Sequence, residues 1–285
     1  MTPRSWRCRD HTLELGRRAL LMGIVNVTPD SFSDGGAFAE TDDAVKHALQ
    51  LLADEADMID VGGESTRPGS EPVPEADELA RVVPVIERLH AEAPDAPISV
   101  DTRKPAVAAA AIAAGAAIVN DVDAAAAPGM LELVRDTGAG LVLMHMLDDP
   151  KTMQRDPRYD DVVGEVRGFL ARRIGAAVAS GIPRDRLCVD PGIGFGKTLD
   201  HNLELLRAIG SFHELGVPVL VGVSRKRFIG ELTGAIEPSD RLEGTAGAVA
   251  WCAAQGVDIL RVHDVKEMAK VVRVVDAIVR GGGLA

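Results

Sequence analysis

Six polar side chains fall at the ends of short apolar segments, and their chemistry suits a flat heterocycle that carries an anionic group. They are Asp101, Asn120, Asp190, Lys226, Arg261 and His263. Carboxylates and an amide complement the N–H donors and the carbonyl of such a ring, and a carboxylate can accept two parallel hydrogen bonds from a guanidine-like edge. A metal site is the alternative, but one histidine and two aspartates in separate segments lack the spacing of metal ligands.

Three cationic side chains indicate where an anion would bind. Arg261 and His263 lie together near the C-terminus, and Arg67 lies in the segment ESTRPGS. An arginine fork donates two hydrogen bonds to a phosphate at once, although Arg67 considered alone is better explained as a solvated loop charge. Asn26 and Thr66 add neutral polar groups. Because Mg²⁺ keeps several waters and relies on substrate phosphates, the Asn26 oxygen could be its only protein ligand.

The segment DPGIGFGKT, residues 190–198, resembles a loop that surrounds the phosphates of a nucleotide. A P-loop needs Gly, four residues and then Gly-Lys-Ser/Thr, and Pro191 stands where the first glycine should be. We therefore interpret the segment as the end of a strand. Asp190 is expected to point toward the ligand, and the glycines let the backbone and Phe195 approach flat rings. Lys197 is expected to face solvent near the start of the following helix.

Eight short apolar runs must carry these residues. They span residues 19–28, 58–63, 98–102, 117–122, 141–146, 187–192, 219–226 and 259–265. The runs are apolar and β-branched at the start, as in strands buried on both faces, and nearly all are polar or glycine-rich at the C-terminal end. Side chains alternate along a strand, so Arg261 and His263 share one face, as do Gly222, Ser224 and Lys226.

Helical patterning separates the runs, for example at 41–56, 74–90 and 160–181. Eight strand–helix units predict an α/β fold, a single (β/α)8 TIM barrel, whose active sites lie at the C-terminal face and often bind phosphate near the last strands. Residues 1–18 are expected to be an N-terminal extension, a hairpin that closes the barrel bottom, and residues 19–285 the barrel. The loops at 26–40 and 64–75 are long enough to act as lids, and Phe32 could close over a flat ligand.

The composition argues against several classes of protein. Apolar residues make up 46% of 285 residues, and the net charge of -12 argues against a nucleic-acid partner. No uncharged run reaches the length of about 18 residues that a membrane span needs, and the N-terminus is too charged for a signal peptide. Three separated cysteines, Cys8, Cys188 and Cys252, indicate neither a disulfide framework nor a zinc site. We expect a cytoplasmic protein that contacts neither nucleic acid nor membrane.

The strand ends carry a set of motifs in a fixed order. Across residues 20–280 they are NVTPDSFSDGG, DVGGESTRPGS, SVDT, NDV, LMHM, DPGIGFGKT, GVSRKRFIG and RVHDV. As an ordered set, they resemble the motifs of the dihydropteroate synthase family. NVTPDSFSDGG, GGESTRPG, SRK and RVHDV are highly specific as a set, whereas SVDT or NDV alone is weak. After NDV, the segment DAAAAPGM departs from the family, in which Ser or Arg and often Gly are common, so the conformation of this loop is open.

The resemblance implies that 4-aminobenzoate displaces pyrophosphate from (7,8-dihydropterin-6-yl)methyl diphosphate, with Mg²⁺ contacted by Asn26, to give 7,8-dihydropteroate. It implies a pterin site made of Asp101, Asn120, Val122, Met144, Asp190, Gly222, Lys226 and Arg261. The implied diphosphate contacts are Asn26, Thr66, Arg67, Arg261 and His263. The implied aminobenzoate site consists of Phe32, Pro68, Phe195 and Ser224, with Lys226 at its edge. The family also suggests a homodimer, and apolar helices at 241–255 and 266–280 could supply its interface.

This reaction needs no strong general base, because an arylamine is neutral and nucleophilic at neutral pH. The departure of pyrophosphate is the difficult step, and Mg²⁺, Arg67, Arg261 and His263 can neutralise its developing charge. An electron-rich dihydropterin stabilises positive charge on the departing methylene, which favours an SN1-like path, and Asp34 could stabilise that cation. The expected catalytic residues are Asp34, Lys226, Arg261 and His263.

Three alternatives fit some of these motifs. Pterin-binding methyltransferase domains of corinoid-dependent systems share the barrel and parts of DVGGES, NDV and DPG, but they would not need STRPG or the SRK–RVHDV pair. An aldolase-like barrel would need a Schiff-base lysine or clear metal ligands. Lys226 could be that lysine in principle, but its neighbours Ser224 and Arg225 give no apolar pocket that would lower its pKa. A catalytically silent paralogue is opposed only by the intact motifs.

Overall fold

Eight parallel strands form the centre of the molecule. The computed structural model of the chain describes residues 4–27, 36–65 and 69–280. The strands are β3 (Leu20–Asn26), β4 (Met58–Gly62), β5 (Ile98–Asp101), β6 (Ile118–Asp121), β7 (Gly140–Met144), β8 (Leu187–Asp190), β9 (Leu220–Gly222) and β10 (Ile259–Val262). They pair in the order β8-β7-β6-β5-β4-β3-β10-β9, and a parallel bridge between Val189 and Val219 joins β8 to the start of β9. The sheet is therefore closed into a barrel.

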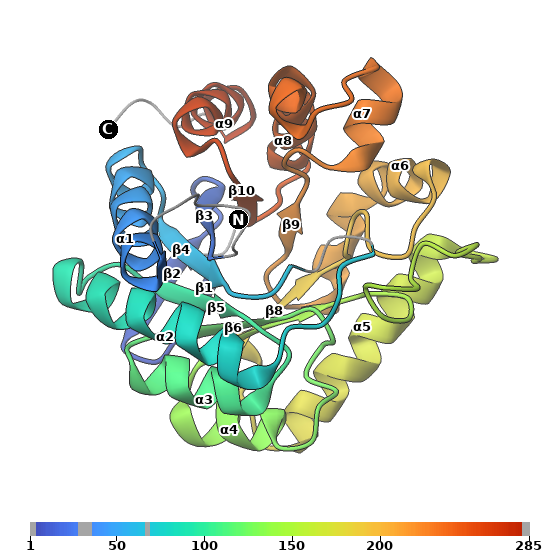
Figure 1. Cartoon of the computed structure of the whole chain (residues 1–285). Coiled ribbons are helices and arrows are strands. Elements are labelled where there is room, and N and C mark those ends of the chain that lie inside the picture. The colour runs from blue at the N-terminus through green and yellow to red at the C-terminus, as the bar shows by residue number, and fades with distance from the viewer. Residues whose placement is uncertain (1–3, 28–35, 66–68, 281–285) are drawn as a thin grey trace.

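Helices surround the strands and return the chain from the end of one strand to the start of the next (Figure 1). They are α1 (Gly36–Ala53), α2 (Glu75–Glu92), α3 (Pro105–Ala113), α4 (Met130–Thr137), α5 (Val162–Ala179), α6 (Leu199–Arg207), α7 (Arg227–Thr233), α8 (Leu242–Ala254) and α9 (Val265–Arg280). The helix expected at 41–56 begins earlier, at Gly36, whereas α2 and α5 lie close to their expected bounds. Within the described ranges, no helix combines the length and apolar character needed to cross a bilayer.

One strand ends well before its expected bound. The run at 219–226 was expected to be a strand throughout, but β9 stops at Gly222. Arg225 adopts a left-handed backbone conformation with φ of 57°, and its N–H donates to Thr245 Oγ1 at 3.0 Å instead of to a neighbouring strand. The turn at Arg225 thus ends the strand and begins α7, which leaves Ser224 and Lys226 beside the barrel mouth.

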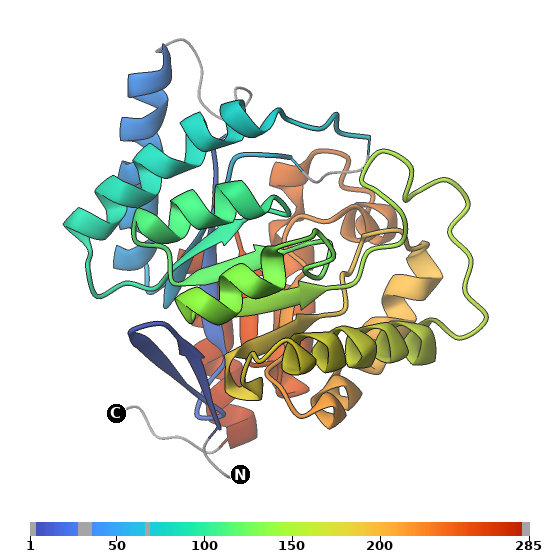
Figure 2. The same cartoon turned by 90° about the horizontal axis from the view of Figure 1, so that it is seen from below.

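An antiparallel hairpin covers one end of the barrel. It consists of β1 (Arg4–Cys8) and β2 (His11–Leu15) and is drawn in dark blue in Figure 2. Trp6, Cys8 and Leu15 are buried against the first inward-facing residues of the barrel strands, among them Met22, Met58, Ile118, Val142, Cys188, Leu220 and Ile259. Gly140 is needed here, because a Cβ at this position would lie 2.4 Å from Cys8 Sγ. The predicted TIM barrel with an N-terminal hairpin is confirmed, and apolar side chains fill the barrel beneath the hairpin.

The first turn of α5 offers a test of local stability. Asp161 is the N-cap residue of this helix, and its Oδ1 accepts a hydrogen bond from the Gly164 N–H at 2.9 Å. Asp161→Ala should therefore lower the free energy of unfolding by about 1 kcal/mol, as measured by urea denaturation. Asp160→Ala is the matched control, since Asp160 is an equally exposed neighbour outside the cap. Equal stability of the two variants would contradict this role of Asp161.

Candidate active site

A cavity of about 720 Å³ opens at the C-terminal ends of the strands. Eight of the predicted site residues line it: Asn26, Asp101, Phe195, Gly222, Ser224, Lys226, Arg261 and His263. Asn120, Met144 and Asp190 are buried in the barrel. Val122 lines a separate, smaller cavity of about 260 Å³, so the structure does not place it in the main cavity. Phe32, Asp34, Thr66, Arg67 and Pro68 lie outside the described residues.

Arg261 links two carboxylates at the base of this cavity. Its Nε donates to Asp60 Oδ2 at 2.6 Å, and its Nη2 donates to Asp101 Oδ2 at 2.9 Å. Asn120 Nδ2 donates to the same Asp60 oxygen at 3.0 Å. Because its amide nitrogen donates to Asp60, the Asn120 side chain is held in one orientation. The four side chains come from four different strands, β4, β5, β6 and β10, and form one hydrogen-bonded group.

Asp60 was missed by the sequence analysis. Its side chain is fully buried inside the barrel, where Arg261 and Asn120 bind it. Its Oδ1 has no hydrogen-bond partner among the described residues. The available signal was period-two alternation, which places Asp60 on the same face of its strand as Gly62. A charged residue in the middle of a short buried strand requires a partner, and that requirement alone should have drawn attention to it.

Burial shifts the protonation equilibria of the cavity's ionisable groups. Burial raises the pKa of Asp101 and of Asp190, although Arg261 opposes the shift at Asp101 and Lys226 opposes it at Asp190. Burial also lowers the pKa of Lys226 to about 8. Ser224 and Arg225 gave no reason to expect a lowered pKa at Lys226, because sequence neighbours do not reveal how deeply an amine is buried in the fold. A ligand that donates hydrogen bonds to the carboxylates would favour their ionised forms.

The segment DPGIGFGKT forms a tight loop after β8. Gly192, Gly194 and Gly196 all have positive φ, of 68°, 85° and 62°, which favours glycine at each position. A Cβ on Gly192 would lie 1.9 Å from the carbonyl oxygen of His145, so close packing also requires glycine there. The loop carries Phe195 to the cavity, where the Lys226 ammonium lies 4.5 Å from the centre of its ring.

The expectation that Lys197 faces solvent was wrong. Its side chain is 3% exposed and also borders the main cavity. Its Nζ lies 3.0 Å from His145 Nδ1, 2.9 Å from the Phe195 carbonyl oxygen and 3.4 Å from the His145 carbonyl oxygen. Three acceptors therefore hold the amine inside the protein. Burial lowers the pKa of Lys197 well below its usual value.

Ser224 and His263 approach each other across β9 and β10. Ser224 Oγ accepts a hydrogen bond from the His263 N–H at 3.2 Å and lies 3.0 Å from His263 Nδ1. His263 lines the cavity together with Arg261. The structure thus brings together both predicted anion-binding residues of the last strand.

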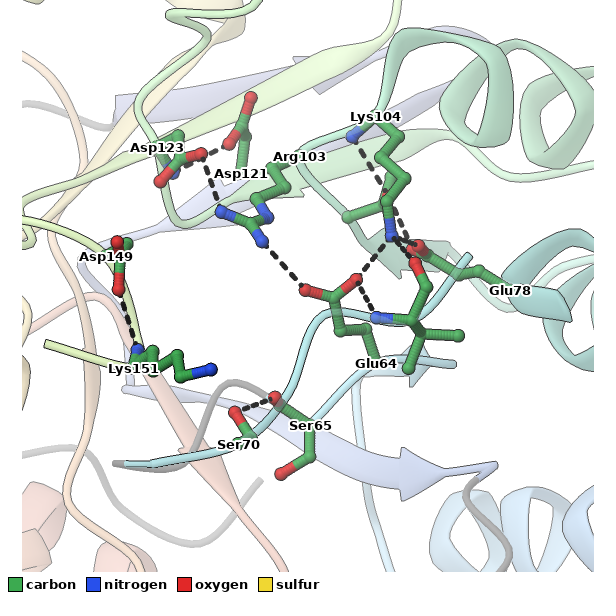
Figure 3. A network of polar contacts seen from close by, with 12 residues as sticks. Glu64, Ser65, Ser70, Glu78, Arg103, Lys104, Asp121, Asp123, Asp149 and Lys151 are labelled. Carbon is green, nitrogen blue, oxygen red and sulfur yellow. Dashed lines mark hydrogen bonds and ion pairs between the residues drawn. The ribbon is translucent and has the colours of Figure 1, made fainter. Parts of the chain in front are cut away.

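A buried ionic network closes the base of the loop that follows β4 (Figure 3). Glu64 accepts hydrogen bonds from Arg103 Nη2 at 3.1 Å, from the Val73 N–H at 3.3 Å and from Lys104 Nζ. Lys104 Nζ also donates to Glu78 and to the Val73 carbonyl. Because Glu64 precedes the loop and Val73 follows it, the network holds the two ends of the loop together.

The unusual segment DAAAAPGM has a defined conformation. Ala124 and Ala125 both have positive φ, of 53° and 57°, which costs roughly 1 kcal/mol or more for each non-glycine residue. Asp121 accepts hydrogen bonds from the N–H groups of Asp123 and Ala125, at 2.7 and 3.1 Å. Arg173 on α5 donates to the carbonyls of Ala124 and Ala125 at 2.8 and 2.7 Å. These contacts hold the segment in one conformation without a glycine at Ala124 or Ala125.

Sequence comparison relates the chain to proteins of known activity. The profile of the family described as "Pterin binding enzyme" matches residues 22–263. Dihydropteroate synthase of Escherichia coli K12 is 48% identical over 257 residues, which cover 90% of both chains. The chain belongs to the dihydropteroate synthase family. The family resemblance that the strand-end motifs indicated is therefore confirmed.

Solved structures agree with this family assignment. The dihydropteroate synthase of Xanthomonas albilineans with 4-aminobenzoic acid superimposes with a TM-score of 0.92 at 50% identity, covering 97% of this chain and 98% of that one. A structure of the same enzyme in complex with 7,8-dihydropteroate gives a TM-score of 0.86 at 47% identity, over 96% of this chain and 98% of that one. The dihydropteroate synthase family thus accounts for the whole barrel.

Asn26 is the candidate protein ligand for Mg²⁺ in this cavity. Within the described ranges, no group of three or more histidine, cysteine, aspartate or glutamate side chains could enclose a metal ion. Asn26 nevertheless lines the cavity, and its Oδ1 lies 3.9 Å from where a Cβ on Gly62 would be. An amide side chain that lines the cavity fits an ion that retains water and binds mainly through a ligand's phosphates.

Proposed function

We propose that the chain condenses (7,8-dihydropterin-6-yl)methyl diphosphate with 4-aminobenzoate to give 7,8-dihydropteroate and pyrophosphate. The observation that carries this proposal is the convergence of Asp101, Lys226 and Arg261 with Phe195 on one cavity. Donor and acceptor groups for a pterin and the aromatic ring of Phe195 therefore line the same cavity. The activities named for the related synthases support the same reaction.

The proposed pterin site lies inside the barrel. Asp101 and Asp190 would accept hydrogen bonds from the pterin's N–H groups, and Asn120 would present the oxygen of an amide whose nitrogen Asp60 already holds. Lys226 would donate to the ring, while Met144 and Gly222 would supply apolar contacts. Arg261 would stack on the pterin. Its bonds to Asp60 and Asp101 hold the guanidinium in the cavity wall for that contact.

The proposed diphosphate site combines Arg261 and His263 with Asn26, Thr66 and Arg67. Asn26 would hold Mg²⁺, which when bound would neutralise charge on the departing pyrophosphate. The aminobenzoate site would consist of Phe195 and Ser224, together with Phe32 and Pro68. The amine would then face the pterin's methylene carbon.

Bond breaking leads bond formation in the proposed mechanism. The bond between the methylene carbon and the diphosphate oxygen breaks first, and the electron pair leaves with pyrophosphate. The electron-rich dihydropterin carries the resulting positive charge, and Arg261 and His263 stabilise the anion. The neutral arylamine then forms the new C–N bond and loses one proton to solvent.

A direct assay tests the proposed function. The protein, Mg²⁺, the dihydropterin diphosphate and 4-aminobenzoate are mixed, and pyrophosphate and dihydropteroate are measured. We expect pyrophosphate release that depends on 4-aminobenzoate and equals the amount of dihydropteroate formed. Absence of reaction with both authentic substrates would overturn the proposal and would favour a catalytically silent paralogue.

Asp34 provides a test of the cationic intermediate. If its carboxylate stabilises positive charge on the methylene, Asp34→Asn should lower kcat by more than it raises KM, because the interaction exists mainly in the transition state. Steady-state kinetics with both substrates would measure the two constants. An unchanged kcat would remove Asp34 from the mechanism.

We also propose a homodimer formed through α8 and α9. Trp251 on α8 and Val274, Ile278 and Val279 on α9 are large apolar side chains that are 45–77% exposed. Exposed apolar surface of this kind favours a subunit interface. Light scattering should give twice the monomer mass, and a monomer at micromolar concentration would contradict the assembly.

A further inference from the structure

We propose that the loop between β7 and α5 positions Phe195, and that Gln154 and Tyr159 are positioning residues for 4-aminobenzoate. This inference rests on the proposed function, because Phe195 is the aromatic wall of the proposed aminobenzoate site. Neither residue belongs to the proposed set of substrate contacts. Both donate to the backbone on either side of Phe195, and Gln154 also lines the cavity.

Four successive carbonyl groups of the loop after β8 accept hydrogen bonds from four different side chains. The Ile193 carbonyl accepts from Lys226 Nζ, the Gly194 carbonyl from Gln154 Nε2 at 2.9 Å, the Phe195 carbonyl from Lys197 Nζ at 2.9 Å, and the Gly196 carbonyl from Tyr159 Oη at 2.9 Å. The Gly194 N–H donates to Asn202 Oδ1 at 2.6 Å. A loop with three glycines would otherwise have many accessible conformations, so these bonds select one.

Gln154 and Tyr159 hold the carbonyl groups of the two residues that flank Phe195, Gly194 and Gly196. Both come from the loop between Met144 and Val162, which is remote in sequence from the loop that they bind. The Tyr159 ring packs edge-on against His201 at 5.0 Å and lies 6.1 Å from the His145 ring. These ring contacts fix the position of the hydroxyl group, so Tyr159 can hold the Gly196 carbonyl in place.

The consequence should be selective for one substrate. The backbone at Phe195 determines which positions its ring can reach, whereas Asp101, Asn120 and Arg261 are carried by strands β5, β6 and β10. Loss of the two bonds should therefore loosen the aminobenzoate wall and leave the pterin end of the cavity in place. Precise placement of an aromatic contact depends on the residues that restrain it.

The test uses Tyr159→Phe, Gln154→Met and the double variant. Tyr159→Phe removes only the hydroxyl and retains the ring contacts, and Gln154→Met removes the donor without adding charge. In the double variant, the KM for 4-aminobenzoate should rise roughly tenfold, with each single variant contributing part of the rise. The KM for the dihydropterin diphosphate should remain unchanged. A control variant, Asp156→Asn with Arg158→Gln, removes an exposed ion pair of the same loop without changing net charge.

The pattern of the two KM values decides the outcome. A selective rise for 4-aminobenzoate supports the positioning role. An unchanged KM for 4-aminobenzoate, or an equal rise for both substrates, would overturn it. If the double variant does not fold, as judged by its thermal unfolding, Tyr159→Phe alone decides. Inactivity of the unmodified protein would be a failure of the proposed function instead, and direct binding of labelled 4-aminobenzoate to the same variants would then still test the positioning role.

Discussion

Arg261→Met is expected to destabilise the protein by about 3 kcal/mol and to abolish synthase activity. The substitution retains the apolar part of the side chain but removes the cation that binds Asp60 and Asp101. Asp60 is fully buried, so its carboxylate would be left without a counter-charge in the barrel. Removing one member of a buried ion pair typically costs about 3–5 kcal/mol, and the partial exposure of Arg261 places the expected value at the low end. Urea denaturation at pH 7.5 measures the loss.

The pH dependence of this loss identifies its cause. Arg261 lowers the pKa of Asp101 against the effect of burial, so its removal should raise that pKa further. A carboxyl whose pKa is higher in the folded state than in the unfolded state binds its proton more tightly when folded. The stability that this bound proton contributes is present at low pH. It is lost as pH rises through the pKa of the carboxyl group in the folded state. The deficit of the variant should therefore be smaller at pH 5 than at pH 8.

A second substitution separates electrostatics from packing. Asp60→Asn combined with Arg261→Met removes the buried charge together with its partner, and the double variant should recover part of the lost stability. Activity should not return, since Arg261 is also a proposed contact of pterin and diphosphate. If the double variant is no more stable than Arg261→Met, the loss arises from packing and not from an unpaired carboxylate.

The barrel and the mouth of its cavity were predictable from the sequence because the relevant signals are local. A strand buried on both faces needs a continuous apolar run, and a residue at its C-terminal end faces the cavity whatever the rest of the chain does. Asp101 and Arg261 could be placed in this way. Alternation along one strand also predicted that His263 and Arg261 share a face, and both line the cavity.

The positions that the sequence analysis missed depend on distant partners. Asp60 is held by Arg261, 201 residues later in the chain. Lys197 is buried because His145, 52 residues earlier, supplies two of its acceptors. A lysine after Gly-Phe-Gly is exposed by default, and only the packing of two neighbouring loops reverses that expectation. The depressed pKa of Lys226 has the same origin, since burial is a property of the folded barrel.

Lys226→Ala is expected to lower kcat/KM for the dihydropterin diphosphate by roughly 10²-fold or more, the effect of removing one partner of a buried charged hydrogen bond. The fold should remain intact. Because burial lowers the pKa of Lys226 to about 8, the charged amine is less favourable in the folded protein than in the unfolded chain. Steady-state kinetics and thermal unfolding measure the two effects, with Lys46→Ala, an exposed lysine on α1, as the control.

The pH profile connects this loss to the ammonium group. In the unmodified protein, kcat/KM for the pterin substrate should fall as pH rises above about 8, because the free enzyme then loses the proton of Lys226. Both substrates already carry their full negative charge at that pH, so their own titration does not produce the decline. The alkaline decline should disappear in Lys226→Ala, whose activity is low throughout. A variant that keeps the same decline would show that another group titrates there, and Lys226 would then act through its contacts with Ile193 and Phe195 and not through its charge.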